Sequence, residues 1–477
     1  MSALERLWQE CRGACGQERV WHRGRALGLS AAVCLGRRTV TGLVGTSGSQ
    51  FRDWSATYRL FSQDRVAVEE VFGVVRSAIE GQLREGAPLV TAMDDTVVRK
   101  SGAKIYGVGY RRDPLSPPFH TNLVRGQRFV QLSAALPAGG VSGAARMVPI
   151  DFAHAPTPAR PRKGADADQW ALYEEARRAA NVSRVGVARL HELRASMDRG
   201  PGEAQRTLWT VVDGRFTNGT VLKGLPERTV LIGRIRKDTR LYHLPQMERH
   251  DGPGRSRQYG QRAPTPEQLR QDRSVPWQTV TVRAAGKRQR VRIKTIAPVR
   301  WRAAGAASDL RLIVIAPLCY RARGKRLYRN PAYLICTDPS VPLEAILQAY
   351  IWRWDIEVNI RDEKQLLGVG EAQVRNPHSV QNLPALLVAS YALLVLAATQ
   401  AFPNGTIPGA LPPPKWRRNT SRQRLSTADI ITQLRAELWG KALGLDNFSG
   451  FTSAYPPNTT PQLFQPDLPS AVLYSSS

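Results

Sequence analysis

The stretch Tyr350-Ile-Trp-Arg353-Trp-Asp-Ile-Glu357-Val-Asn-Ile-Arg-Asp-Glu-Lys364 is the most informative part of this sequence. Arg353, Glu357 and Lys364 follow Tyr350 by 3, 7 and 14 residues. In an α-helix, at about 100° per residue, these four side chains share an arc of about 60°. The other acids of the stretch project elsewhere: Asp355, Asp362 and Glu363. Glu357 is therefore the acid that shares a face with a phenol and two cations.

The chain around this stretch predicts a helix that follows two acid-ended strands. Pro339-Ser340-Val-Pro342 indicates a helix start with Ser340 as cap, and Gly368 an end. The apolar runs 88–96 and 207–214 are typical of buried strands, and they finish at Asp94-Asp95 and at Asp213.

Rigidly held carboxylates of this kind suit a metal site for phosphoryl transfer. Two divalent ions about 3.5–4 Å apart clamp the attacking and leaving oxygens of a phosphodiester. Mg²⁺ takes few protein carboxylates because it keeps several waters, and Arg and Lys neutralise phosphates. Each signal also has an ordinary interpretation: a strand-end Asp is commonly a turn residue, and Arg353–Glu357 is a standard i, i+4 ion pair. The ion pair explains two residues but not the alignment of four.

The spacing Tyr350-x2-Arg353-x3-Glu357-x6-Lys364 resembles the Y-R-E-K signature of bacterial insertion-sequence DDE transposases. The contexts Ala92-Met93-Asp94-Asp95-Thr96 and Val211-Val212-Asp213-Gly214-Arg215 resemble the two aspartate motifs of that group. The resemblance spans roughly residues 85–400. It implies an α/β fold with an RNase H-like catalytic core, interrupted by a β-rich insertion between the second Asp and the Glu.

The resemblance also implies roles for single residues. Asp95, Asp213 and Glu357 would be the catalytic, metal-binding acids, with Mg²⁺ as cofactor and Mn²⁺ able to substitute. Asp95 is preferred to Asp94 because the family's acid directly precedes threonine; neighbours in a strand point to opposite faces, so only one of them reaches the metals. Tyr350, Arg353 and Lys364 would contact phosphates near the transposon end. Which tryptophan, if any, holds a flipped base stays open, and a core role is expected for Trp352 and Trp354.

Further cations are weaker candidates for DNA contacts. Arg234, Arg236 and Lys237 follow a predicted strand at 229–235, and a solvated edge explains them equally well. Arg37 and Arg38 lie at the edge of two short predicted helices joined by a Gly turn, which suits a DNA-binding helix-turn-helix. An ordinary helical hairpin is the commoner structure for such a pattern.

Charge supports a nucleic-acid partner. The 477 residues hold 68 Lys+Arg against 39 Asp+Glu, a net charge of +29, and such an imbalance attracts polyanions. Residues 228–340 alone carry 25 Lys or Arg against seven Asp or Glu, a net +18. Five scattered cysteines indicate reduced thiols. The apolar segment 383–402 is expected to be a buried core helix, not a membrane span, so we expect a cytoplasmic protein. The resemblance implies a bacterial protein associated with the nucleoid.

These observations predict five regions: a helical DNA-binding region 1–85, a first core part 86–227, a basic β-rich insertion 228–340 whose first strand (about 229–236) belongs to the core, a second core part 341–402, and a helical region with a flexible tail, 403–477. The favoured function is a cut-and-paste transposase that acts on double-stranded DNA as a homodimer. The alternatives are a domesticated protein that binds DNA without cutting it, and a structure-selective nuclease. The terminal repeats, the target and the excision intermediate cannot be deduced from the sequence.

Overall fold

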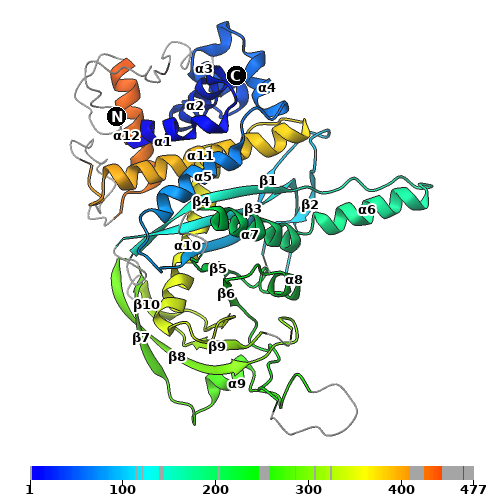
Figure 1. The fold of residues 1–477 in the computed structure, drawn as a ribbon, viewed down its shortest axis with the longest axis vertical. Helices are drawn as coiled ribbons and strands as arrows, with labels where there is room; N and C mark the ends of the chain where they lie inside the picture. The colour runs from blue at the N-terminus through cyan, green and yellow to red at the C-terminus, as the bar shows by residue number, and fades with distance from the viewer. Residues whose placement is uncertain are drawn as a thin grey trace.

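The computed structural model is a mixed α/β protein built on one large open sheet (Figure 1). The structure describes residues 3–113, 116–117, 119–120, 122–138, 144–200, 205–245, 257–284, 286–305, 308–322, 325–407, 424–442 and 466. The expected flexible tail at the end of the region 403–477 lies outside these residues, except for residue 466.

The large sheet contains ten strands in the order β2-β3-β1-β5-β6-β12-β9-β8-β7, with β4 paired to β3. β1 is parallel to β5 and β5 to β6, whereas the other neighbours are antiparallel. The strand bounds are β1 Leu89–Arg99, β2 Gly109–Arg112, β3 Leu123–Ala138, β4 Ala144–Ala155, β5 Leu208–Val212, β6 Thr229–Arg234, β7 Gln278–Ala284, β8 Lys287–Val299, β9 Leu310–Ile315 and β12 Ala332–Cys336. β10 Cys319–Ala322 and β11 Lys325–Tyr328 form a separate hairpin.

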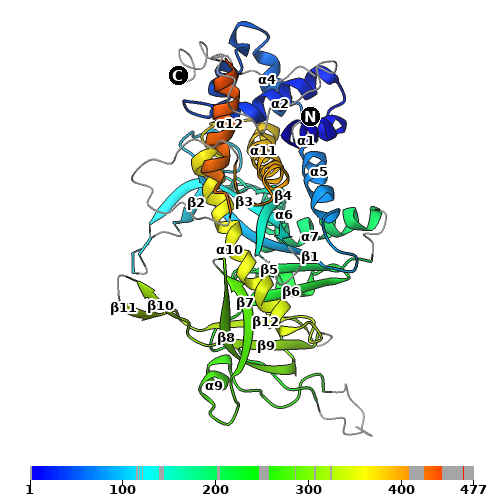
Figure 2. The same ribbon diagram turned by 90° about the vertical axis from the view of Figure 1, so that its left-hand side faces the viewer.

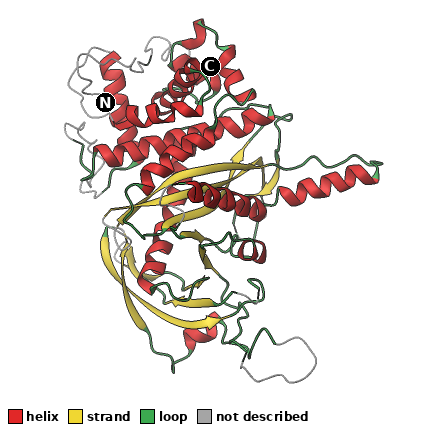
Figure 3. Ribbon diagram, viewed as in Figure 1, coloured by secondary structure: helices red, strands yellow, loops and turns green. Residues whose placement is uncertain are grey.

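Most helices gather at one end of the molecule (Figure 3). The strands β12, β9, β8 and β7, which extend the sheet beyond β6 and are called the added strands below, lie towards the other end. The α-helices are α1 Ala3–Glu10, α2 Glu18–Val33, α3 Val40–Thr46, α4 Ser55–Ser62, α5 Val68–Glu80, α6 Ala167–Ala179, α7 Val182–Arg199, α8 Gly219–Lys223, α9 Pro266–Gln271, α10 Leu343–Leu366, α11 Pro377–Ala401 and α12 Thr427–Ala442; the 3₁₀ turns are η1 Cys11–Ala14 and η2 Ser49–Phe51.

The two faces of the sheet belong to two hydrophobic cores, because side chains alternate along each strand. Val90 and Ala92 of β1 pack with Trp352 and Ile356 of α10. On the opposite face, Leu89 and Met93 join the larger core that α5, α7 and α11 help to form. Figure 2 shows α10 running lengthwise across the sheet, from the helical end to the added strands. The alternation therefore decides which acid of β1 faces α10.

The N-terminal helices pack onto α11, and α2 approaches α11 closely. A Cβ atom built on Gly28 of α2 would lie 2.5 Å from Ser390 Oγ of α11 and 2.6 Å from the Trp8 ring. α11 is long and apolar enough to cross a membrane by length and composition alone, but 94% of its most apolar window is buried inside the structure. The expectation of a core helix here is confirmed.

Several predicted elements differ from the structure. Asp94 and Asp95 lie in the middle of β1 and not at its end, because β1 continues to Arg99 to pair with β3. The sequence 105–110 suits a strand but is mostly turn, and β2 begins only at Gly109. The charged sequence 166–197 suits one long helix but forms two, since Asn181 caps a new helix with its side chain. The strand β4 had not been predicted.

The helix with Glu357 also begins later than expected. Its N-cap is Pro342, without a side-chain cap, and Ser340 instead hydrogen-bonds to Asp338. Apart from the β10–β11 hairpin, the strands of the basic segment 228–340 do not form a sheet of their own, because β12 pairs with β6 and β9 with β12 and these strands thereby extend the core sheet.

Candidate active site

Two acids from distant parts of the chain lie side by side at one point of the sheet. β1 and β5 run side by side in parallel, with Met93 opposite Val212, so the next residues along the two strands are Asp94 and Asp213. Asp213 ends β5 in a tight turn, in which its Oδ1 accepts hydrogen bonds from the backbone N–H of Arg215 (2.9 Å) and of Phe216 (3.3 Å). These bonds fix the direction of the Asp213 carboxylate.

Asp94 lies on the face of β1 that α10 covers. Its Oδ2 is 3.6 Å from Nη1 of Arg353. The same guanidinium, through Nη2, lies 3.1 Å from Oε1 of Glu357. The buried Arg353 side chain thus bridges Asp94 of β1 and Glu357 of α10. The ordinary ion pair expected between Arg353 and Glu357 forms one half of this bridge.

Asp95 points the other way. Its carboxylate is buried and lies 3.2 Å from Nε of Arg128 on β3 and 3.2 Å from Nε of Arg215. The sequence-based preference for Asp95 rested on the threonine that follows. In the structure the strand alternation turns Asp94, and not Asp95, towards α10.

Burial and mutual repulsion act on the strand acids. Burial and, to a lesser extent, the charge of Asp213 raise the pKa of Asp94 to about 7, although the backbone hydrogen bond from Asp95 and the charge of Arg353 act in the opposite direction. Burial also raises the pKa of Asp95, where Arg215 and Arg128 act in the opposite direction. The Asp94–Asp213 pair is thus a place where a further cation would be stabilised.

The arrangement is not a preformed three-carboxylate metal site. Within the described ranges, no three His, Cys, Asp or Glu side chains come together closely enough to hold a metal ion. The expectation that three acids share ions is therefore not met in this conformation, in which Arg353 stands between Asp94 and Glu357. Asp94 and Asp213 alone still offer the hard oxygen ligands that Mg²⁺ takes from one or two carboxylates, with water completing its shell.

The remaining residues of the predicted helix face have different surroundings. Tyr350 is half-buried. Lys364 is held inside the protein, since its Nζ donates a hydrogen bond of 2.9 Å to the Val97 carbonyl, and burial lowers its pKa. Trp352 is buried as expected, whereas Trp354 is 62% exposed and the expectation of a core role for it was wrong.

The weaker DNA-binding candidates are exposed, except for Arg38, which makes contacts within the protein. Arg234, Arg236 and Lys237 are exposed and line a cavity of about 980 Å³, which also reaches Gly214 beside Asp213. In the helical region Arg37 is exposed. Arg38 instead contacts Glu371 through its backbone N–H at 2.6 Å and its guanidinium at 3.8 Å, so it joins α3 to the segment after α10.

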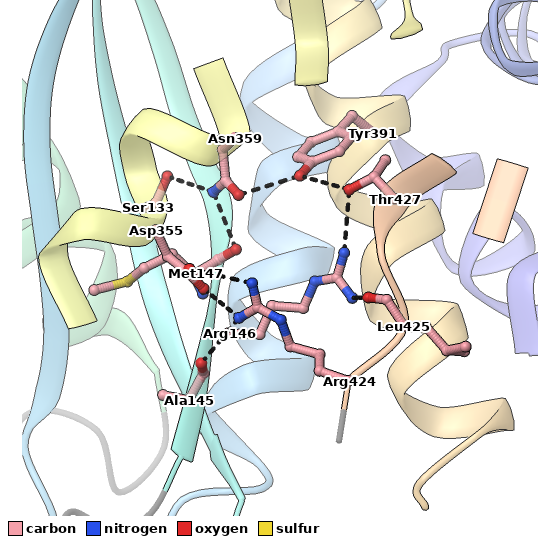
Figure 4. Close-up of polar contacts among 10 residues, drawn as sticks. All are labelled: Ser133, Ala145, Arg146, Met147, Asp355, Asn359, Tyr391, Arg424, Leu425 and Thr427. Carbon is pink, nitrogen blue, oxygen red and sulfur yellow. Dashed lines mark hydrogen bonds and ion pairs between the residues drawn. The ribbon is translucent and has the colours of Figure 1, made fainter. Parts of the chain in front are cut away.

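A network of polar contacts with β4 and α11 holds α10 in position (Figure 4). The buried Asn359 donates to the Met147 carbonyl of β4 at 3.0 Å and accepts from the Tyr391 hydroxyl of α11 at 3.1 Å. The acid that had been expected to point away from the site, Asp355, pairs with Arg424. Because Asn359 is two residues from Glu357, this network helps to set the position of the acid.

Sequence reasoning missed the arginines around Asp95. Arg111 on β2, Arg128 on β3 and Arg215 after β5 all act on this carboxylate. Arg215 stood within the second aspartate motif, but nothing in the local sequence marks Arg111 and Arg128. Only the pairing of β2 with β3 and of β3 with β1 brings them together.

Neighbouring acidic residues on a mixed sheet, faced by a helix with Arg and Glu in a strongly basic chain, define the site class of a nuclease-type α/β enzyme. The comparison with protein families agrees. The sequence model of the DDE superfamily endonucleases matches residues 17–304, more than half of the chain, and this chain belongs to that family. The match includes Asp94, Asp95 and Asp213 but ends before Glu357 and the Y-R-E-K spacing. No curated protein matches the chain.

Membership of this family indicates the general class of activity. The family indicates a transposase-type nuclease that acts on DNA and uses a divalent metal. The mixed α/β architecture with a mostly open sheet fits this assignment.

Proposed function

We propose that this protein is a DNA transposase of the Y-R-E-K type, which cleaves the ends of an insertion sequence and transfers the freed strand to a target. The observation that carries the proposal is the Arg353 bridge, which links Asp94 of β1 to Glu357 of α10 next to Asp213. It unites residues of the first acid motif and of the Y-R-E-K spacing in one site. The three antiparallel strands β4, β3 and β1, continued by the parallel β5 and β6, support an RNase H-like core.

In this proposal Asp94, not Asp95, is the first catalytic acid. Asp94 and Asp213 would hold a divalent ion such as Mg²⁺, which would polarise the phosphoryl oxygens and activate the attacking water or hydroxyl. Arg353 neutralises Asp94 and Glu357 before DNA arrives. A DNA phosphate offers this guanidinium a strong alternative partner, and its departure would free Glu357 to join the other two acids.

The surrounding cations suit the same substrate. The exposed Arg234, Arg236 and Lys237 line the cavity next to Asp213, where they would contact the DNA backbone. The contact of Lys364 with the Val97 carbonyl suggests that it positions β1 against α10, so a direct phosphate contact by Lys364 requires that bond to break. Two copies acting on two ends, and a location at the bacterial nucleoid, belong to the same proposal.

The first experiment compares acid variants on DNA from the borders of the protein's own element. Glu357→Gln and Asp94→Asn are expected to lose Mg²⁺-dependent nicking by at least about 100-fold, because each removes a group from the phosphoryl-transfer site. Binding of the same DNA in EDTA should change by less than about three-fold. Cuts mapped on labelled strands are the measurement.

Asp95→Asn is the matched control for Asp94→Asn, since it removes an equal charge from the adjacent residue. We expect its nicking rate to fall less than that of Asp94→Asn. Equal cleavage by the parent and Glu357→Gln would overturn the proposal. Cleavage that favours branched DNA over border DNA, without strand joining, would favour a structure-selective nuclease.

A further inference from the structure

Three arginines converge on one buried carboxylate behind the proposed catalytic acids. Arg128 and Arg215 each place Nε 3.2 Å from an oxygen of Asp95. Arg111, on the neighbouring strand, also interacts electrostatically with Asp95 and with Arg215. Asp213 also acts electrostatically on Asp95. The group therefore carries three positive charges against two negative charges, and a positive surplus remains.

The guanidinium groups are incompletely satisfied. Arg111 donates from Nη2 to the Thr157 hydroxyl at 2.6 Å, but its buried Nε has no hydrogen-bond partner among the described residues. Arg128 Nε faces Asp95 without the alignment of a hydrogen bond. Buried donors left in this state are unfavourable, so an additional acceptor would stabilise the cluster.

The cluster is strongly electropositive. Burial, followed by the charges of Arg111 and Arg215, lowers the pKa of Arg128 to about 10, although Asp95 opposes this. The same field reaches His154, whose pKa falls to about 4 through burial, Arg111 and Lys100. Like charges held together in this way are unfavourable unless an anion joins them.

The cluster is also open to a ligand on one side. The Asp95 side chain is 6% exposed and that of Arg128 16%, whereas that of Arg215 is 46% exposed. The carboxylate thus lies at the base of the cluster and Arg215 at its opening. Arg215 follows Asp213 by two residues, so the opening lies beside the proposed catalytic acids.

We propose that Arg111, Arg128 and Arg215 form a binding site for one backbone phosphate of the DNA strand next to the phosphodiester that is cut. Planar guanidinium groups bind phosphate oxygens in pairs, which makes arginine the preferred residue for such sites. Asp95 holds the arginines in position and limits their repulsion when no DNA is present. This inference rests on the proposed function, because it assigns the ligand from the DNA substrate.

The experiment measures binding of fluorescent border DNA by the full-length protein in EDTA, over about 50–300 mM KCl. Arg215→Gln should weaken binding roughly ten-fold, as expected for a lost charge-assisted contact, and reduce the slope of log K against log salt by about 0.9 if the phosphate contact is lost. Arg111→Gln is the second variant. Arg177→Gln on α6, which projects from the body of the molecule (Figure 1), is the control for loss of one exposed charge; its affinity should stay within about two-fold.

Duplexes with single methylphosphonate substitutions identify the phosphate. At one position near the mapped cut, the neutral linkage should weaken binding by the parent but not further weaken binding by Arg215→Gln, because both changes remove the same contact. Parental affinity and salt slope in both Arg215→Gln and Arg111→Gln would overturn the inference.

Free phosphate is the other source of the same chemistry. If potassium phosphate raises the melting temperature of the parent above that in KCl of equal ionic strength, while Arg215→Gln binds DNA normally, the site binds the free ion and the DNA assignment is wrong. If the variants lose DNA affinity but the parent does not nick DNA with Mg²⁺, the phosphate site stands and the proposed function fails.

Discussion

At the scale of single residues, adjacent positions in one strand have separate duties. Asp94 faces α10 and Arg353, while Asp95 faces Arg128 and Arg215. Arg353 is the residue on which the site depends, because it balances Asp94 and Glu357 in the absence of a metal. It is therefore a competitor for the same carboxylates that a divalent ion would use.

Arg353→Gln tests this competition. Removing the guanidinium should raise the affinity of the DNA-free protein for Mn²⁺ several-fold, since Asp94 and Glu357 lose their resident cation. Isothermal titration calorimetry measures the change, and nicking of border DNA should fall in parallel because the phosphate contact is lost. Tighter Mn²⁺ binding by the parent than by the variant would contradict the competition.

Glu363 predicts a pH dependence of stability. Burial raises its pKa to about 8, even though the hydrogen bond of 2.9 Å that Gln131 donates to it and the charge of Lys364 act in the opposite direction. The folded state then holds a proton that the unfolded state releases above its ordinary pKa, so this contribution to stability is complete in acid and is lost as pH rises towards about 8.

Glu363→Gln keeps the shape of the side chain and removes the titration. We expect little change in the free energy of unfolding at about pH 5, and a gain of roughly 2–4 kcal/mol at about pH 8.5. Urea denaturation at the two pH values is the measurement. An equal effect at both values would show that Glu363 is not protonated in the fold.

At the scale of elements, α10 is positioned by what packs behind it. Asn359 connects it to β4 and α11, and Arg146 connects β4 to the segment before α12 through the Leu425 carbonyl (3.0 Å) and the Thr427 hydroxyl (3.2 Å) (Figure 4). The sequence of α10 predicts only a helix, and its place in the fold comes from buried hydrogen bonds to β4 and α11. The Glu357 side chain inherits that place.

Tyr391→Phe removes one link of this network. The hydroxyl donates to Asn359 Oδ1 at 3.1 Å, and a buried acceptor without its donor costs about 1–3 kcal/mol. We expect a lower melting temperature and, because α10 loosens, slower nicking of border DNA. Tyr58→Phe, on the partly exposed α4, is the control and should leave the melting temperature unchanged. An unchanged melting temperature for Tyr391→Phe would show that this hydrogen bond does not stabilise the fold.

At the scale of the whole molecule, the charge is spread along the sheet. The net charge is +29, and the added strands contribute exposed Lys287, Arg288 and Arg290 on β8. Since β12, β9, β8 and β7 continue the sheet that carries Asp94 and Asp213, the basic segment and the acids belong to one continuous structure. In the proposed function a long DNA duplex would contact both.

Binding of border DNA should consequently depend steeply on salt. A protein that neutralises about 6–10 phosphates loses roughly 10³–10⁵-fold in affinity between about 50 and 200 mM salt. Fluorescence anisotropy in EDTA measures this without cleavage. An affinity that changes by less than about ten-fold over this range would mean that the surplus charge does not serve DNA binding.

The sequence by itself determined the local facts about this protein: the apolar runs of β1, β5 and β6, the helical spacing of Tyr350, Arg353, Glu357 and Lys364, and the basic character of residues 228–340. These depend on neighbours in the chain and on composition. The tertiary structure alone decided that Asp94 faces α10, that Lys364 bonds to Val97, and that Arg111 and Arg128 meet Asp95. Such contacts depend on strand register and on residues far apart in sequence. A shift of β1 by one residue would turn Asp95 towards α10 in place of Asp94.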